Sequence, residues 1–207
     1  MYKAYLKRGI DLVISLATFI LISPLFVLLC LLVRIFIGKP IFFRQTRTTK
    51  NKKKFDIIKF RTMTNDRNER GEYLSDEKRL TKVGRLLRTS SLDELPELIN
   101  IIRGDMSIIG PRPLPASYLN YYREDEMARF EVRGGLIPPD SVDLSAVISW
   151  DQQFKYEENY GKNVSFGMDI KILIGAFRII FQRGKTDYGS FVRLPLNVER
   201  KNMNNDK

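Results

Sequence analysis

Residues 12–33 read LVISLATFILISPLFVLLCLLV and contain no charged side chain. At a rise of ~1.5 Å per residue, a helix of this length measures about 33 Å, enough to cross a hydrocarbon core of ~30 Å. The stretch is longer than the usual core of a signal peptide, and the residues after it, Arg34-Ile35-Phe36-Ile37, do not form a cleavage site of small residues. The sequence therefore predicts a membrane-embedded helical segment.

Ser23-Pro24 lies near the middle of this stretch. Proline lacks a backbone donor and clashes with the preceding turn, so Pro24 predicts a break in the helix. Basic residues, which prefer the cytoplasmic side, stand on both flanks. A re-entrant helix-break-helix over residues 1–38 would keep both flanks on that side; an ordinary transmembrane helix with a tolerated proline is the alternative. The flanking residues are Lys3, Lys7 and Arg8 before the stretch, and Arg34, Lys39, Arg44, Arg47, Lys50, Lys52, Lys53 and Lys54 after it.

The positive charge of the chain is concentrated at its N-terminal end. The net charge is +11 over 207 residues, and residues 1–61 hold 13 Lys and Arg against only Asp11 and Asp56. Such asymmetry points to an anionic partner, and the uncharged stretch favours phospholipid headgroups over nucleic acid. The absence of His and the single Cys30 exclude Ser-His-Asp triads, His-ligated zinc and an internal disulfide framework.

The rest of the chain predicts a mainly α fold with a small β-hairpin. Apolar positions at helical or alternating spacing define the elements, and a segment rich in glycine and proline predicts a loop. The helix over 166–182 is expected to lie on the membrane interface, or to be a buried core helix. We expect three regions: 1–38 in the membrane, a cytosolic catalytic domain over 39–185 lying on the membrane, and a tail over 186–207. The expected elements are strands 41–46 and 54–61, helices 76–88, 92–102, 117–130, 149–160 and 166–182, and an irregular loop 134–147.

Ser91-Leu92-Asp93-Glu94 matches the S-x-x-E pattern of a helix capping box. In one interpretation the motif only starts a helix, because the helix dipole stabilises acidic residues in a first turn. In the other, the same dipole keeps Asp93 ionised as a nucleophile beside a bound phosphate. Glu94 would then add an oxygen ligand for Mg²⁺, an ion held by few carboxylates together with substrate phosphates.

Several basic residues are candidate phosphate ligands. In Pro111-Arg112-Pro113 the two prolines hold Arg112 on a stiff extended backbone, which suits a bidentate clamp or simply makes a rigid turn. Lys59 and Arg61, within Lys59-Phe60-Arg61-Thr62-Met63, are predicted either to contact phosphate or to form the charged outer face of a strand. Arg88 is placed to contact either Asp93 or a phosphate.

Together these motifs resemble those of the bacterial sugar transferases of the small, monotopic phosphoglycosyl transferase type. The resemblance covers about residues 1–185. It rests on Ser23-Pro24, on the segments around Lys59 and Arg112 quoted above, on Arg88-Thr89-Ser90-Ser91-Leu92-Asp93-Glu94-Leu95-Pro96 and on Gly104-Asp105-Met106-Ser107.

This resemblance implies a reaction in two steps. Asp93 attacks the β-phosphate of a UDP-sugar, UMP leaves, and undecaprenyl phosphate then accepts the phosphosugar; Mg²⁺ is required. The resemblance also implies a re-entrant helix broken at Ser23-Pro24. The product would start surface-glycan or glycoprotein-glycan assembly at the cytoplasmic face of the bacterial inner membrane.

The resemblance further assigns substrate contacts to Arg133, Glu157 and Asp169. One loop departs from the family pattern, which is of the type R-P-G-I-T-G-W-A-Q-V-N-G-R-N: residues 133–149 read RGGLIPPDSVDLSAVIS and lack the second arginine. We interpret this as altered donor specificity. A non-catalytic membrane scaffold of polysaccharide assembly is the competing hypothesis.

Overall fold

The computed structural model of the protein describes residues 2–143, 148–182 and 193–205. The chain forms two compact units that are interleaved along the sequence. The first comprises Met1–Asp11, Thr46–Phe55 and Gly104–Lys207, and the second comprises Leu12–Gln45 and Asp56–Arg103. The predicted boundary at 38 stays a prediction, and the one at 185 lies outside the described residues.

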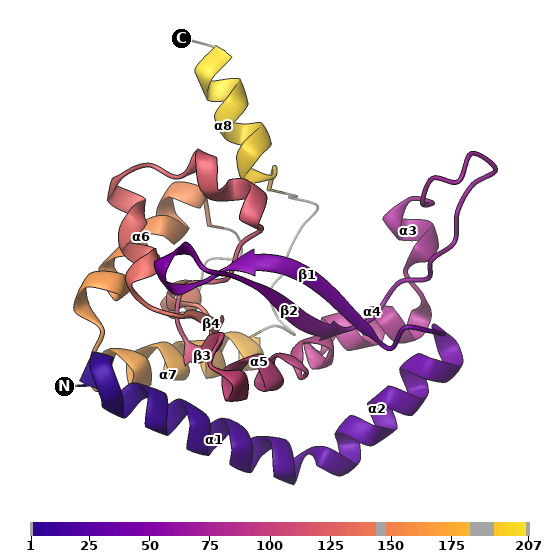
Figure 1. Cartoon of the computed structure of the whole chain (residues 1–207), viewed down its shortest axis with the longest axis horizontal. Coiled ribbons are helices and arrows are strands. Elements are labelled where there is room, and N and C mark those ends of the chain that lie inside the picture. The colour runs from indigo at the N-terminus through magenta and orange to yellow at the C-terminus, as the bar shows by residue number, and fades with distance from the viewer. Residues whose placement is uncertain (1, 144–147, 183–192, 206–207) are drawn as a thin grey trace. The chain divides into compact units, whose positions relative to one another are not determined.

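Most of the described elements are helices, as predicted (Figure 1). The α-helices are α1 Lys7–Leu21, α2 Ser23–Phe36, α3 Asp76–Arg79, α4 Lys82–Thr89, α5 Glu97–Arg103, α6 Trp150–Asn163, α7 Phe166–Gln182 and α8 Leu196–Asn205. A π-helical turn, η1 Tyr2–Leu6, precedes α1, and the 3-10 helices are η2 Lys50–Lys52, η3 Leu92–Glu94, η4 Ala116–Tyr121, η5 Asp125–Glu131 and η6 Pro139–Val142. The strands are β1 Phe42–Thr48, β2 Lys54–Phe60, β3 Met106–Ile109 and β4 Gly134–Ile137.

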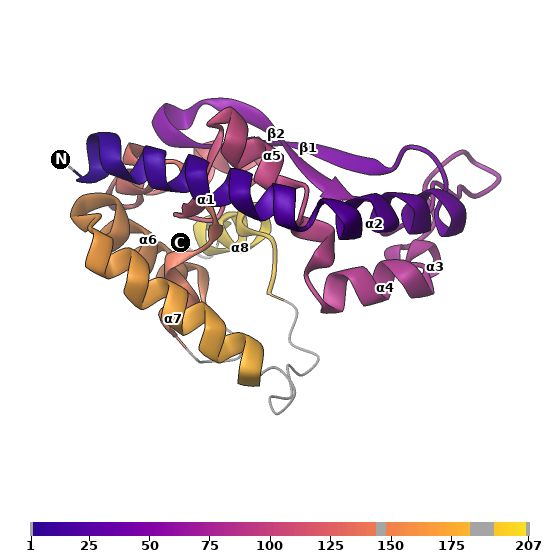
Figure 2. The same cartoon turned by 90° about the horizontal axis from the view of Figure 1, so that it is seen from below.

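The apolar N-terminal stretch folds as two helices with a bend of 66° between them (Figures 1 and 2). The predicted break is confirmed: α1 ends at Leu21, and Pro24 lies in the first turn of α2, where its missing N–H costs no hydrogen bond. Within the described chain no single helix is long and apolar enough to cross a membrane, but this bent pair is when taken together. Many of its large apolar side chains are exposed, among them Val13, Ile20, Leu21, Val27, Leu31 and Ile35.

The second unit is organised around the inner face of α2. Leu29 and Val33 of that helix pack with Phe60 of β2 and Leu87 of α4 in one hydrophobic cluster. The helices α2 and α4 lie side by side (Figure 2). Gly84 lets α4 approach the chain that follows β2, because a Cβ at that position would come within 1.8 Å of the Thr62 carbonyl oxygen.

The strands β1 and β2 form the predicted hairpin (Figure 1). The first unit holds a second, parallel pair, in which β3 aligns Met106 with Gly134 and Ile109 with Ile137 of β4. The prediction of an irregular loop from residue 134 is therefore wrong for β4, and residues 144–147 of that loop lie outside the described chain. The two glycines of β4 suggested a loop, but Gly135 is needed by the strand pair, since its Cβ would lie 2.1 Å from the Gly110 nitrogen.

Other elements differ in detail from the prediction. The predicted helix 76–88 is broken into α3 and α4, because Thr81 starts a new helix by accepting the Gly84 N–H with its side chain. The segment predicted as helix 117–130 folds as the 3-10 helices η4 and η5. Helices are confirmed at α6 and α7. The predicted tail contains α8, whose Arg200 pairs with the buried Glu126.

Helix α7 has one buried and one exposed apolar face. Ile172 packs in the core of the first unit with Tyr160 and Ile109. On the opposite face, Phe166, Ile170, Ile174 and Phe177 follow one another at helical spacing and are all exposed. The helix therefore packs in the core on one side and exposes an apolar surface on the other, and its position at a membrane interface stays a prediction.

Candidate active site

Asp93 and Glu94 lie in the short helix η3 and not in the first turn of an α-helix. Ser91 adopts a left-handed backbone conformation with φ of 57°, and within the described chain its side chain makes no capping hydrogen bond to η3. The α-helix α5 starts only at Glu97, after Pro96. The predicted capping box and the dipole argument built on it are therefore wrong, because Leu95-Pro96 separates the acidic pair from the helix.

Lys59 contacts the segment Asp93-Glu94, which we call the acidic turn. Lys59 of β2 donates a hydrogen bond to Glu94 Oε1 at 2.6 Å and pairs with Glu97 Oε1 at 3.1 Å. Partial burial raises the pKa of the Asp93 carboxyl above its usual value, and the charges of Lys59 and Arg88 oppose that rise. A half-buried carboxylate of raised basicity beside cations suits a nucleophile that receives an anionic substrate.

The other two basic candidates of this unit are bound to their surroundings. Arg88 donates from Nε to the Thr62 hydroxyl at 3.0 Å. Arg61 is buried and donates to the carbonyl oxygens of Ile37 and Lys39, so its terminal nitrogens fix the chain after α2. Of the predicted site residues, the second unit thus brings Lys59, Glu94 and Asp93 together, while the guanidinium of Arg61 supports the backbone.

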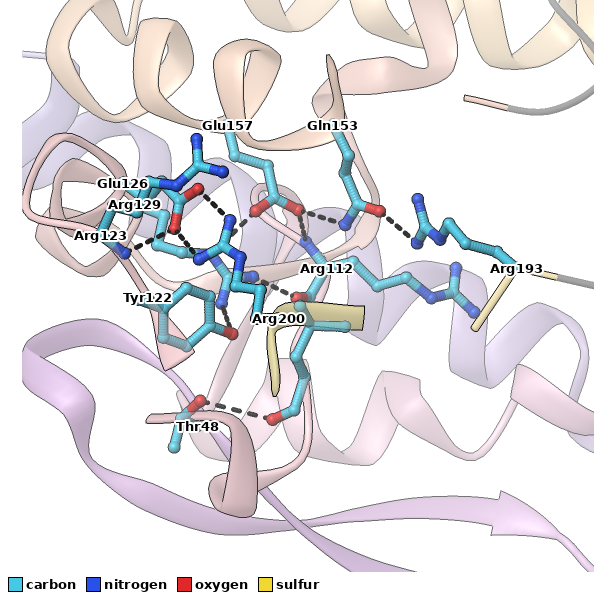
Figure 3. Close-up of polar contacts among 11 residues, drawn as sticks. Thr48, Arg112, Tyr122, Arg123, Glu126, Arg129, Gln153, Glu157, Arg193 and Arg200 are labelled. Atoms are coloured by element: carbon cyan, nitrogen blue, oxygen red, sulfur yellow. Dashed lines mark hydrogen bonds and ion pairs between the residues drawn. The ribbon is translucent and has the colours of Figure 1, made fainter. Parts of the chain in front are cut away.

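In the first unit, Arg112 is held by its main chain (Figure 3). Its N–H donates to Glu157 Oε1 at 3.2 Å, and its carbonyl accepts from Arg129 at 2.6 Å. Arg129 and Glu157 form an ion pair of 2.8 Å, with side chains 3% and 0% exposed. Glu157 therefore positions the Arg112 backbone, and Arg129, which the sequence analysis missed, completes that support.

Asp140 and Arg193 are further charged residues of this region that the sequence analysis missed. Arg193 donates to Gln153 at 2.8 Å (Figure 3) and stacks on the Trp150 ring at 3.5 Å. Asp140 Oδ1 is buried, and among the described residues nothing hydrogen-bonds to it. Burial, with the charge of Glu157, raises the pKa of Asp140 to about 6, while Arg112 and Arg193 act in the opposite direction. In the sequence, Asp140 could have been recognised as a candidate only because it is a charged residue directly after Pro138-Pro139.

We predict that Asp140→Asn stabilises the protein at high pH only. A pKa of about 6 in the folded state, above ~3.9 in the unfolded chain, means that ionised Asp140 lowers stability as pH rises from about 4 to above 6. The variant should gain about 2–3 kcal/mol at pH 8 and nothing at pH 4. Thermal unfolding at both pH values measures this, with the exposed Asp76→Asn as control; an equal gain at both would contradict it.

Arg133 and Asp169, also in the first unit, are engaged in structural contacts. Arg133 donates from Nε to the Gly104 carbonyl at 2.8 Å. Asp169 is buried and accepts hydrogen bonds from Tyr2, Lys7 and Tyr160 at 2.5, 2.7 and 2.6 Å. These contacts tie the start of the chain to α6 and α7. The assignment of both residues to substrate binding stays a prediction.

The acidic turn could bind Mg²⁺ only together with a substrate that supplies further oxygen ligands. Among the described residues no group of three or more Asp, Glu or Cys is placed to hold a metal ion. Mg²⁺ commonly uses one or two protein carboxylates, with phosphate oxygens and water completing the shell. Asp93 and Glu94 offer such a pair.

Comparisons with known proteins agree on one family. Residues 2–183 match the bacterial sugar transferase family. The chain is 42% identical over 168 residues to the "Uncharacterized sugar transferase EpsL" of Bacillus subtilis (strain 168), covering 81% of this chain and 83% of that protein.

Two further relatives have names that state a reaction. One is the UDP-glucose:undecaprenyl-phosphate glucose-1-phosphate transferase of Escherichia coli (strain K12), 33% identical over 81% of this chain and 38% of that protein. The other is the UDP-N-acetylgalactosamine-undecaprenyl-phosphate N-acetylgalactosaminephosphotransferase of Aeromonas hydrophila, 32% identical over 86% of this chain and 44% of that protein. The chain thus spans less than half of either enzyme. Since the family match covers most of its length and includes the acidic turn, the chain belongs to the bacterial sugar transferase family.

Proposed function

We propose that this protein transfers a sugar-1-phosphate from a UDP-sugar to undecaprenyl phosphate and releases UMP. The observation that carries the proposal is the acidic turn: Asp93 is half-buried with a raised pKa, and Glu94 is fixed by Lys59 at 2.6 Å. The names of two relatives, 32% and 33% identical to this chain, state this kind of reaction. The product would start a surface glycan or a glycoprotein glycan.

The reaction follows from a carboxylate nucleophile on phosphorus. A carboxylate oxygen of Asp93 forms a bond to the β-phosphorus of the UDP-sugar, and the bond from that phosphorus to the bridging oxygen breaks, so UMP leaves with the electron pair. A phosphate oxygen of undecaprenyl phosphate then attacks the same phosphorus and releases the Asp93 carboxylate. The net products are UMP and undecaprenyl diphosphate sugar, with no change of oxidation state.

The neighbouring residues support these steps by charge and position. The Lys59–Glu94 pair fixes the turn so that Asp93 keeps its orientation, and Lys59 and Arg88 add positive charge next to the incoming diphosphate. Arg112, whose backbone is fixed within the first unit, stays a predicted phosphate ligand because of its planar guanidinium. Mg²⁺, held by Asp93 and Glu94, would neutralise phosphate charge.

The bent pair α1–α2 is proposed to enter the membrane and return on the cytoplasmic side. Its exposed apolar side chains, the break at Ser23-Pro24 and the basic flanks support this arrangement. The exposed apolar face of α7 would lie among the phospholipid headgroups. Both features support the proposed location at the cytoplasmic face of the bacterial inner membrane.

This topology predicts that both ends of the pair are reached from the cytoplasm only. In a Cys30→Ser background, single cysteines replace Tyr5 and Lys39, which are both exposed. Neither should react with an impermeant maleimide in spheroplasts, and both should react after permeabilisation. Labelling of position 5 in intact spheroplasts would show a spanning helix instead.

The enzyme assay separates the transferase from a non-catalytic scaffold. Full-length protein in nanodiscs should release UMP from at least one UDP-sugar when undecaprenyl phosphate and Mg²⁺ are present. A panel of UDP-sugars identifies the donor. Absence of UMP with every donor, from a folded protein, would favour the scaffold.

A further inference from the structure

The second unit contains an open groove that the proposed chemistry has not used. Its volume is about 920 Å³, and it lies where the chain leaves α2 and enters β1. Apolar side chains form much of its lining, including Ile41, Phe42 and Phe43. Three basic side chains, Arg34, Lys39 and Arg44, stand around this apolar lining.

These three cations are available to an external anion. All three residues are exposed, and within the described part of the chain none of their side chains forms an ion pair. Arg61, which also lines the groove, differs from them because it is buried and donates to the carbonyl oxygens of Ile37 and Lys39. Arg61 thereby fixes the backbone that carries Lys39 at the groove.

The apolar surface of α2 continues to the groove. Ile35 and Phe36, at the end of the helix, are 71% and 58% exposed, and Phe43 is 46% exposed. A ligand that places a phosphate among the cations can therefore lay a hydrocarbon chain on apolar side chains. A nucleotide would instead need polar partners for its base, and Asn65 is the one uncharged polar residue of the lining.

The charge favours a phosphate monoester over an ordinary phospholipid. A monoester with a second pKa near 6 carries a charge of about −1.5 to −2 at pH 7, whereas a phosphodiester headgroup carries about −1 from its phosphate. Three unpaired cations match the monoester better. The groove also shares its hydrophobic cluster with the acidic turn, since Ile41 and Phe42 pack on the same core as Leu92 and Leu95.

We propose that this groove binds the acceptor, a long-chain isoprenoid phosphate, with its phosphate among Arg34, Lys39 and Arg44 and its chain on the apolar lining. This inference rests on the proposed function, because it gives the second substrate of that reaction a binding site. It concerns the second half-reaction only. The first half-reaction, in which UMP leaves, should not depend on the groove.

Kinetics of the two half-reactions test the site. In full-length protein, the double substitution Arg34→Ala and Arg44→Ala should raise KM for undecaprenyl phosphate at least about tenfold, the loss expected from about 1.4 kcal/mol of phosphate contacts. The burst of UMP from donor alone should stay as in the wild type. Lys54→Ala removes an exposed charge at the first residue of β2, outside the groove lining. It should change neither the KM for undecaprenyl phosphate nor the UMP burst. An unchanged KM, or a smaller burst in the double variant, would overturn the assignment, the latter because the groove would then serve the donor.

A binding measurement keeps this test independent of turnover. Native mass spectrometry of full-length protein released from phosphatidylcholine nanodiscs should show retained undecaprenyl phosphate in the wild type and loss of it in the double variant. Phosphatidylglycerol, added in its place, should not be retained. Equal retention of both lipids would make the groove a general headgroup site and refute the inference. If a wild type without transferase activity retains undecaprenyl phosphate in this manner, the proposed function fails while the binding site stands.

Discussion

Asp93→Asn should lower the rate of UMP release by a factor of about 10⁴ or more, with the fold retained. The amide is nearly isosteric with the carboxylate but cannot form an acyl phosphate, and removal of a covalent nucleophile typically costs this much. Stability should change little, because Asp93 is half-buried with a raised pKa and gains little from its charge in the folded state. UMP release in nanodiscs and thermal unfolding measure the two effects separately.

The covalent step has its own readout. Wild-type protein incubated with donor alone and quenched in acid should carry one phosphosugar adduct per chain by intact-protein mass spectrometry, and Asp93→Asn should carry none. Asp76→Asn, on an exposed helix of the same unit, should keep the adduct and the rate. Full activity of Asp93→Asn would disprove the covalent mechanism.

The second large effect concerns the buried ion pair Arg129–Glu157, which contacts the Arg112 backbone. Glu157→Ala should destabilise the protein by about 3–5 kcal/mol, because it leaves the Arg129 guanidinium buried without its carboxylate. The Arg112 N–H and Gln153 also lose their acceptor. In thermal unfolding this corresponds to a decrease of about 10 °C in the midpoint for a chain of this size.

Two variants distinguish this explanation from a general intolerance of α6. Glu158→Ala removes the next residue, whose ion pair with Lys162 is partly exposed to solvent, and should leave the unfolding midpoint nearly unchanged. Replacing both members, Arg129→Met with Glu157→Met, should restore much of the lost stability, since no uncompensated charge is then buried. If the double variant is as unstable as Glu157→Ala, the buried-charge explanation is wrong.

The features that depend on neighbouring residues could be predicted from the sequence. The uncharged stretch 12–33 and Pro24 are sufficient to predict two helices with a break, because helix propensity and the missing N–H of proline act locally. The regular apolar spacing of residues 149–160 and 166–182 gave α6 and α7 for the same reason. The motif around Asp93 was found because a short series of residues carries the family resemblance.

The contacts of the charged residues depend on segments that are far apart in the chain, so the sequence did not predict them. Ser91-Leu92-Asp93-Glu94 satisfies the capping pattern, but Pro96 and the Lys59 contacts from a distant strand favour a 3-10 turn. The β3–β4 pair joins segments far apart in the chain, so the two glycines of β4 suggested a loop. Glu157 and Asp169 were assigned to substrate binding by the family resemblance. In the structure, the Glu157 carboxylate forms an ion pair with Arg129, and the Asp169 carboxylate accepts a hydrogen bond from Tyr2. A carboxylate becomes a nucleophile, a support or an anchor according to its burial and its partners, and long-range packing sets both.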